Sequence, residues 1–157
     1  MKIKIRKFKP RDAEECGMIA TENEIKLFGK IQPSDVTWNF VKNMFPSKFL
    51  KSCRKKGRQT YVAESNGKIV GYTKFSKKEK RGHVTHLFAD CDLRGKGIGS
   101  KLLEFVESKL KKMNLKKIGL NSAYFKPTIK FYEKMGYTKI RNSSVHGIRV
   151  IYMEKKL

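Results

Sequence analysis

Acidic residues are scarce in this sequence. Its 157 residues include 14 Asp and Glu against 37 Lys and Arg, so the formal net charge at pH 7 is +23. The few acidic residues gather near the N-terminus, whereas residues 36–157 hold 29 basic and 8 acidic side chains. Such a surface attracts polyanions, which raises association with nucleic acid or the ribosome as a hypothesis. A solvated lysine-rich surface without a functional role explains the same balance and is the simpler interpretation.

Long apolar runs and paired cysteines are also missing. No stretch approaches the roughly 20 apolar residues that cross a bilayer, and the N-terminus alternates charged and apolar residues where a signal peptide would be continuously apolar. We therefore expect a cytoplasmic protein with no membrane partner. Cys16, Cys53 and Cys91 are odd in number and widely separated, so the sequence predicts neither a disulfide framework nor a metal site.

Hydrophobic and aromatic residues are plentiful enough to form a core. Hydrophobic residues make up 39% of the chain and aromatic residues 11%, which excludes a disordered protein. The length suits one domain with a proper core, and there are no repeats, linkers or low-complexity tracts. We therefore expect a single domain over residues 1–157.

Hydrophobic periodicity predicts the order β-α-α-β-β-β-α-β-α-β-β. Asp12 and Glu15 resemble a capping box at the start of the first helix, and Asn66-Gly67 is typical of a hairpin turn. The fold class is α/β (α+β), with a mixed, mostly antiparallel sheet of about seven strands flanked by about four helices. Strands are expected at 2–9, 59–65, 68–75, 83–90, 117–121, 137–141 and 148–154, with helices at 12–28, within 34–56, up to Met113 and from Pro127 to Met135.

A glycine-rich loop joins the strand that ends near Asp90 to the next helix. Its glycines, Gly95, Gly97 and Gly99, stand at alternate positions and leave backbone N–H groups uncovered, while the helix N-terminus adds a favourable dipole. Arg94 adds positive charge, as does Lys96 two residues later. This combination predicts a phosphate-binding loop.

Two common nucleotide motifs do not fit the loop. A P-loop requires Lys-Ser or Lys-Thr after its last glycine, but Gly99 is followed by Ser100 and then Lys101. A dinucleotide fingerprint requires Gly-x-Gly-x-x-Gly in the first turn of a βαβ unit, whereas this loop lies mid-chain after an expected antiparallel meander.

The loop instead resembles that of the GNAT superfamily of acyl-CoA N-acyltransferases. Arg94-x-x-Gly97-x-Gly99 matches the Arg/Gln-x-x-Gly-x-Gly/Ala cofactor loop of that family. The segment Phe131–Tyr137 resembles the family's C-terminal Phe-Tyr-x-x-x-Gly-Phe/Tyr element, one helix and one strand further on. Thr128, three residues before Phe131, departs from the alanine that the family often has at that position. The resemblance follows the whole chain in element order and is strongest over 83–137.

The resemblance implies transfer of an acetyl group from acetyl-CoA to a primary amine of a small molecule or protein, by direct attack in a ternary complex without a metal. It implies that backbone groups of the strand before the loop bind the pantetheine arm, that loop amides bind the pyrophosphate, and that Tyr132 lies near the sulfur as general acid. A purely structural role for Tyr132 remains open. The cofactor-binding residues implied are Leu87, Phe88, Ala89, Arg94, Gly95, Lys96, Gly97, Ile98, Gly99, Ser100, Asn121 and Lys134.

The sequence leaves three possibilities for the general base: His83, His86 or no side-chain base at all. His83 lies near the position of a glutamate in many family members, and imidazole titrates in the useful range. Period-two alternation places His83 with Thr85 and Leu87 on one face of the strand and His86 on the other. A structural role for either histidine is an equal alternative, and some family members use no side-chain base.

The acceptor is expected near the first helices. Glu22, Glu24 and Asp35 would attract a cationic amine there, and aromatic side chains in the second helix are expected to pack rather than line the site: Trp38, Phe40 and Phe45. The competing hypothesis is a basic binding module for nucleic acid or the ribosome built on the same fold. The sequence leaves monomer and homodimer open.

Overall fold

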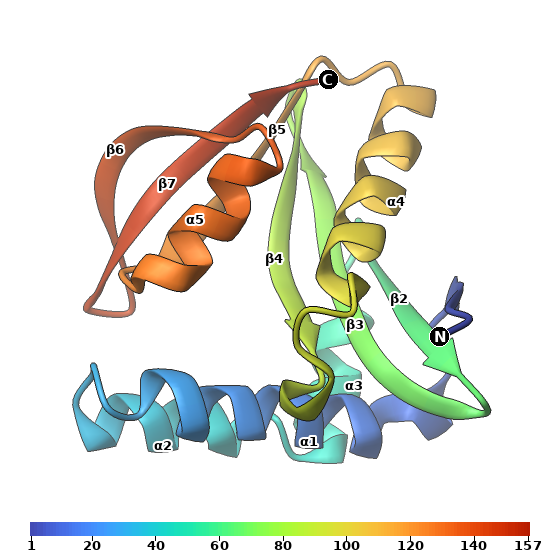
Figure 1. Ribbon diagram of the computed structural model, residues 1–157, viewed down its shortest axis with the longest axis vertical. Coiled ribbons are helices and arrows are strands. Elements are labelled where there is room, and N and C mark those ends of the chain that lie inside the picture. Colours follow the sequence, from blue (N-terminus) through green and yellow to red (C-terminus); the bar gives the residue numbers. More distant parts are fainter.

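The computed structural model describes all 157 residues and contains a seven-stranded sheet with five α-helices (Figure 1). The helices are α1 (Ala13–Asn23), α2 (Ser34–Lys42), α3 (Pro46–Cys53), α4 (Ile98–Lys112) and α5 (Lys126–Lys134), and a π-helical segment, η2 (Glu24–Phe28), continues α1. The strands are β1 (Lys4–Lys7), β2 (Arg58–Ser65), β3 (Lys68–Lys78), β4 (Arg81–Ala89), β5 (Lys117–Ala123), β6 (Thr138–Val145) and β7 (Ile148–Lys156). No helix is both long and apolar enough to span a bilayer.

The sheet has the strand order β1-β2-β3-β4-β5-β7-β6. Every neighbouring pair is antiparallel except β4 and β5. The predicted mixed, mostly antiparallel sheet is therefore confirmed. There is one helix more than the expected four, because Pro46 begins a new helix at a position where its missing N–H costs nothing.

Helices cover both faces of the sheet (Figure 1). On one face, Leu103, Val106 and Leu110 of α4 pack against Phe75 and Val84 in a core that extends under α5. On the other face, α1 and α3 bury a second core that includes Cys16, Phe49, Val62 and Tyr72. The apolar spacing predicted for the helix after the glycine loop is the stripe that α4 turns to the sheet.

The start of α1 differs from the predicted capping box. The Asp12 carboxylate accepts the Lys9 backbone N–H at 2.7 Å and forms an ion pair with Arg6, also at 2.7 Å. Glu15 accepts the Ile69 N–H of β3 instead of turning back to the helix start. The two carboxylates therefore tie the helix to the sheet, which a local sequence pattern does not reveal.

Strands β4 and β5 separate after a short contact. Their parallel ladder covers three residue pairs and ends at Val84 and Leu120. Figure 1 shows the two strands diverging beyond this point, with β5 staying beside β7 and β4 staying beside β3. The second half of β4, from Thr85 to Ala89, consequently has one edge without a strand partner.

A β-bulge in β4 reverses part of the predicted alternation. Lys74 pairs with His86 and Phe75 with Val84, so Thr85 is an extra residue in the ladder. The bulge places His83 on the same face as His86, opposite to α4, while Leu87 joins Val84 on the face covered by α4. The prediction that the two histidines lie on opposite faces is therefore wrong, because one inserted residue shifts the period-two pattern.

Candidate active site

A cavity of about 390 Å³ opens where β4 leaves β5. Three parts of the chain form its wall: the end of α1 with η2, the end of β4 with the glycine loop and the start of α4, and the first two turns of α5. The lining residues are Asn23, Leu27, Phe28, Leu87, Phe88, Ala89, Leu93, Arg94, Gly95, Gly97, Ile98, Gly99, Ser100, Pro127, Thr128, Phe131 and Tyr132.

The glycine loop presents unpaired N–H groups to this cavity. Gly95 and Gly97 have φ angles of +77° and +76°, which residues other than glycine rarely adopt. Gly97 precedes α4 without any side-chain cap, and Lys101 is the first residue of the helix whose N–H is bonded, to the Gly97 carbonyl at 3.0 Å. The N–H groups of the first helical turn are thus free to bind an anion.

Arg94 supplies the positive charge at this site. Its side chain is exposed, lines the cavity and takes part in no ion pair. The neighbouring Asp92 lies 3.9 Å from Lys26 Nζ, so the carboxylate has another cation close by. A guanidinium beside free helix N-terminal amides is a favourable arrangement for a phosphate group.

The opposite wall holds the free edge of β4. Asn23 of α1 donates one hydrogen bond to the Ala89 carbonyl at 2.8 Å and another to the Ile19 carbonyl at 2.9 Å. This side chain fixes α1 against the end of β4. Backbone groups of Leu87 in the same wall point to the edge that has no strand beside it and remain available to an extended ligand.

Tyr132 reaches the cavity from α5. The side chain is 8% exposed and packs between the rings of Phe131 and Tyr137, at centroid distances of 5.1 and 5.8 Å. Its hydroxyl makes no hydrogen bond within the protein, and the residue is part of the cavity lining. Burial raises its pKa well above the usual value, and the phenol stays protonated at neutral pH.

Neither predicted histidine lines the cavity. His86 Nδ1 lies 3.0 Å from the Tyr72 hydroxyl in an aromatic cluster with Phe40 and Phe88. Burial, with the charge of Lys74, lowers its pKa to about 3, and burial with nearby basic side chains lowers that of His83 to about 4. Both imidazoles are neutral and weakly basic at pH 7.

The remaining predicted cofactor residues fall into two groups. Residues Leu87 to Ala89 and most of the loop line the cavity together. Lys96, Asn121 and Lys134 are exposed and lie outside the lining. None of the lining residues is Asp, Glu or His, so the cavity wall offers no carboxylate or imidazole as a base.

The residues expected around the acceptor are scattered. Glu24 is buried, bonded by Gln32, and its pKa is raised by burial. Glu22 is half-buried and pairs with Lys26, while Asp35 is exposed. Trp38 and Phe45 are 58% and 59% exposed, so the expectation that they pack is wrong. The α2 helix instead turns Thr37 and Val41 inward.

Several wall residues escaped the sequence analysis. Leu27 and Phe28 enter the cavity because the π-helical segment η2 continues α1, and the Phe28 ring meets Phe125 edge to face at 5.8 Å. No local pattern signals a π-helical segment. Asn23 did carry a signal, since a polar residue at an apolar position of a helix needs a partner.

The fold thus brings a split sheet and an uncapped helix N-terminus together at one cavity. Residues 18–157 match the acetyltransferase (GNAT) domain family. The chain therefore belongs to the GNAT acetyltransferase family, as its loop and C-terminal motifs indicated.

Individual relatives agree with this assignment. An uncharacterised N-acetyltransferase of Methanocaldococcus jannaschii is 32% identical over 104 residues, which cover 66% of this chain and 56% of that protein. The PaiA N-acetyltransferase of Thermoplasma acidophilum, solved in complex with coenzyme A, superimposes with a TM-score of 0.85 at 20% identity over the full length of both chains. A GNAT-family acetyltransferase of Staphylococcus aureus gives 0.77 at 20% identity over 99% of each. At such identity the two structures establish the fold.

Proposed function

We propose that this protein transfers an acetyl group from acetyl-CoA to a primary amine of a small molecule or protein. The observation that carries the proposal is the uncapped start of α4, whose free amides and Arg94 meet in one cavity. The pyrophosphate of coenzyme A is the anion that suits this position. A coenzyme A complex of a protein with the same fold supports this assignment.

The pantetheine arm and the thioester of acetyl-CoA are assigned to successive parts of the cavity wall. The free edge of β4 offers the backbone N–H and C=O of Leu87 and the N–H of Ala89 to the amide groups of the pantetheine arm, while the Ala89 carbonyl is bonded to Asn23. This arm would then run from the loop toward the point where β4 and β5 separate. Phe131 and Leu93 line its apolar sides. The thioester would reach the hydroxyl of Tyr132 at the far end of the wall.

Tyr132 is the proposed general acid. A neutral amine attacks the thioester carbonyl, the new C–N bond forms and the C–S bond breaks, and the departing thiolate takes the phenolic proton. The proton lost by the amine passes to water, because the cavity wall contains no carboxylate or imidazole, and water returns a proton to the Tyr132 phenolate. The proposal therefore assigns no base to His83 or His86.

Gly97→Glu tests the cofactor site. A carboxylate at this position would face the pyrophosphate and cost several kcal/mol, so acetyl-CoA should bind at least about 100-fold more weakly in isothermal titration calorimetry. Gly67→Glu is the matched control, because Gly67 has a φ of +77°, close to the +76° of Gly97, and equally open surroundings outside the cavity lining. Gly97→Ala separates backbone strain from charge and should retain most of the affinity.

Two results would contradict the proposal. One is a folded wild-type protein that shows no saturable binding of acetyl-CoA. The other is an equal loss of affinity in the Gly67 and Gly97 variants, which would trace the effect to general destabilisation. A positive result leads to an acceptor screen with small amines and peptides, read out by release of free coenzyme A thiol.

A further inference from the structure

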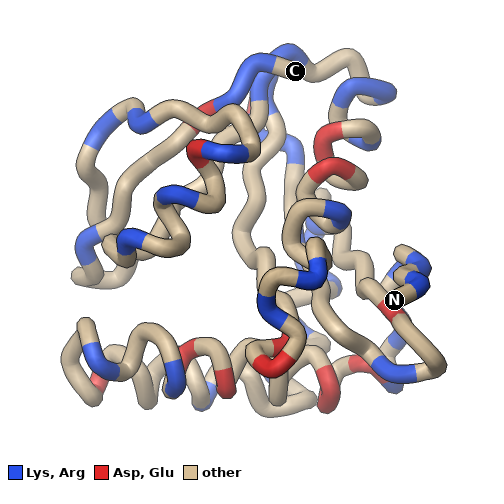
Figure 2. Tube along the Cα trace, in the orientation of Figure 1, with Lys and Arg blue, Asp and Glu red and all other residues tan.

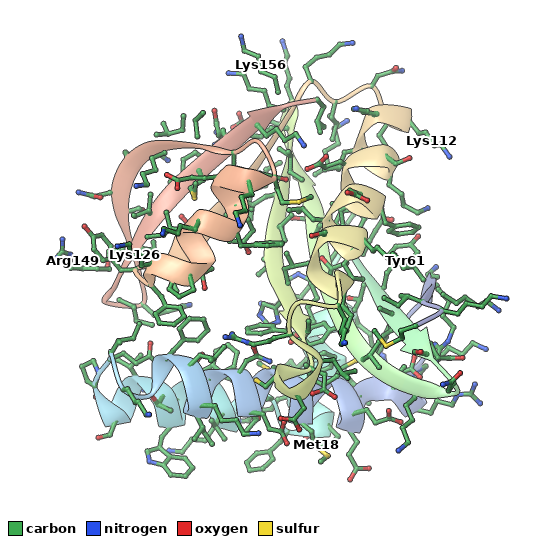
Figure 3. All side chains as sticks on the ribbon, viewed as in Figure 1. Met18, Tyr61, Lys112, Lys126, Arg149 and Lys156 are labelled. Atoms are coloured by element: carbon green, nitrogen blue, oxygen red, sulfur yellow. The ribbon has the colours of Figure 1, made fainter.

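Basic side chains concentrate at the end of the molecule where α4 ends and the C-terminus lies (Figure 2). Three segments meet here: Lys77–Arg81 at the β3–β4 turn, Lys109–Lys117 at the end of α4, and Lys155–Lys156 in β7. We call this surface the basic end. Its 16 residues include 11 Lys and Arg and one acidic residue, Glu79. Figure 3 shows Lys112 and Lys156 projecting outward from it.

A concave surface lies within the basic end. A cavity of about 670 Å³ is bounded by the β3–β4 turn on one side and the α4–β5 connection on the other. The connection is held by the Leu157 N–H, which donates to the Lys116 carbonyl at 2.9 Å. The cavity is lined by Lys77, Glu79, Lys80, Arg81, Met113, Asn114, Leu115, Lys116 and Lys117.

Most of these charges have no counterion. Arg81 is paired with Glu154 at 3.1 Å and Lys155 with Glu107 at 2.8 Å. The other nine basic side chains form no ion pair. The pKa of His83 is lowered mainly by burial, and the charges of Lys78 and Arg81 lower it further.

The end of α4 explains only part of this concentration. Lysines in the last turn of a helix interact favourably with its dipole, which applies to Lys109, Lys111 and Lys112. It does not apply to the β3–β4 turn or to Lys116 and Lys117, which repel one another across the cavity. A ligand with several negative charges would remove this repulsion.

The basic end is separate from the acetyl-CoA cavity. The two cavities share no residue. Helix α4 begins at the glycine loop and ends at Lys112, so its 15 residues place the two sites roughly 20 Å apart. A ligand at the basic end would leave the cofactor site accessible.

We propose that the basic end binds the phosphate backbone of a nucleic acid. A row of closely spaced phosphates matches the unpaired lysines of the two facing segments, and each contact releases counterions. Met113 is the one exposed large hydrophobic residue here, which is too little apolar surface to insert into a membrane or to form the core of a protein interface. No exposed aromatic side chain lies in the three segments of the basic end to stack on bases, so binding there should be largely independent of sequence.

The test is fluorescence anisotropy with a labelled 20-nucleotide single-stranded RNA and a duplex of the same length, between 50 and 300 mM KCl. With about four to six phosphate contacts, the slope of log K against log salt should be about −3 to −4 for the single strand. A variant replaces by Glu the four lysines that line the cavity: Lys77, Lys80, Lys116 and Lys117. It should bind the RNA about 100-fold or more weakly at 100 mM salt. Acetyl-CoA binding should be unchanged, which verifies the fold of the variant.

The matched control changes the same number of charges elsewhere. Exposed lysines outside the basic end are replaced by Glu at Lys4, Lys48, Lys51 and Lys68, and affinity should change by less than about fivefold. Equal losses in both variants would overturn the proposal, because net charge alone would then account for binding. Absence of binding, or tighter binding to vesicles with anionic lipid or to polyglutamate, would overturn it as well.

Discussion

Tyr132 illustrates how one side chain acquires a chemical role from its surroundings. The Phe131 and Tyr137 rings hold its aromatic body, and Tyr137 is itself fixed by a 3.0 Å hydrogen bond to Glu107. Lys155 donates to the same carboxylate at 2.8 Å. The free hydroxyl of Tyr132 is therefore oriented by packing, and burial keeps it protonated.

Tyr132→Phe should lower kcat by about 10²- to 10³-fold and leave the Kd for acetyl-CoA unchanged, because the phenolic proton is needed only when the thiolate departs. Steady-state kinetics with the amine found in the acceptor screen would measure it. Tyr137→Phe is the comparison: it removes a hydroxyl bonded to Glu107 and should lower stability with little effect on kcat. If Tyr132→Phe lowers kcat by less than about fivefold, Tyr132 is not the general acid and has only a packing role.

Helix α4 connects the two proposed sites, and its distance from the sheet depends on two glycines in the strands below it. A Cβ at Gly71 would lie 2.8 Å from both Ile98 Cγ2 and the Phe88 carbonyl oxygen, at the start of the helix. A Cβ at Gly82 would meet the terminal methyl groups of Leu110 near the other end, which can move aside. The first contact therefore controls the position of the helical turn that carries the free amides.

Gly71→Ala should weaken acetyl-CoA binding about tenfold, although residue 71 is outside the cavity wall, because the first turn of α4 must shift. Gly82→Ala should lower the free energy of unfolding by about 1–3 kcal/mol, with little effect on acetyl-CoA binding. Urea unfolding and calorimetry on both variants make the comparison. Equal affinities in the two variants would show that the position of the first turn is not critical.

At the scale of the whole molecule, the positive charge is poorly compensated. The net charge is +23, and the seven ion pairs within 4.0 Å engage few of the 37 basic residues. Figure 2 shows that α1 carries acidic residues and no Lys or Arg, whereas basic residues lie on all the other α-helices and on every strand. Mutual repulsion in the compact state therefore opposes folding, and dissolved salt screens it.

The melting temperature should rise by several degrees between 20 and 300 mM NaCl, where the Debye length falls below about 10 Å. Differential scanning calorimetry at constant pH measures the change. The variant with Glu at Lys77, Lys80, Lys116 and Lys117 should gain less from salt, since it begins with weaker repulsion. A melting temperature that is flat or falls with salt would mean that the surface charges are already well separated.

Local sequence determined most of the elements and the glycine-rich loop. Alternation marked the strands, the spacing of Leu102, Val106 and Leu110 marked α4, and Gly97 marked a turn that other residues rarely adopt. These features depend on the conformational preferences of a few neighbouring residues, so they can be predicted from the sequence. The two motifs at their spacing were enough to indicate the family, which the comparison over residues 18–157 confirmed.

Tertiary structure decided everything that depends on residues far apart in the chain. The bulge at Thr85 brought the histidines to one face, and the separation of β4 from β5 opened the cavity. Residues from α1, β4 and α5 then met in one wall, with Asn23 joined to Ala89 across 66 positions. Long-range packing chooses among local conformations of similar energy, so a bulge, an exposed Trp38 or a shared wall has no signature in the neighbouring sequence.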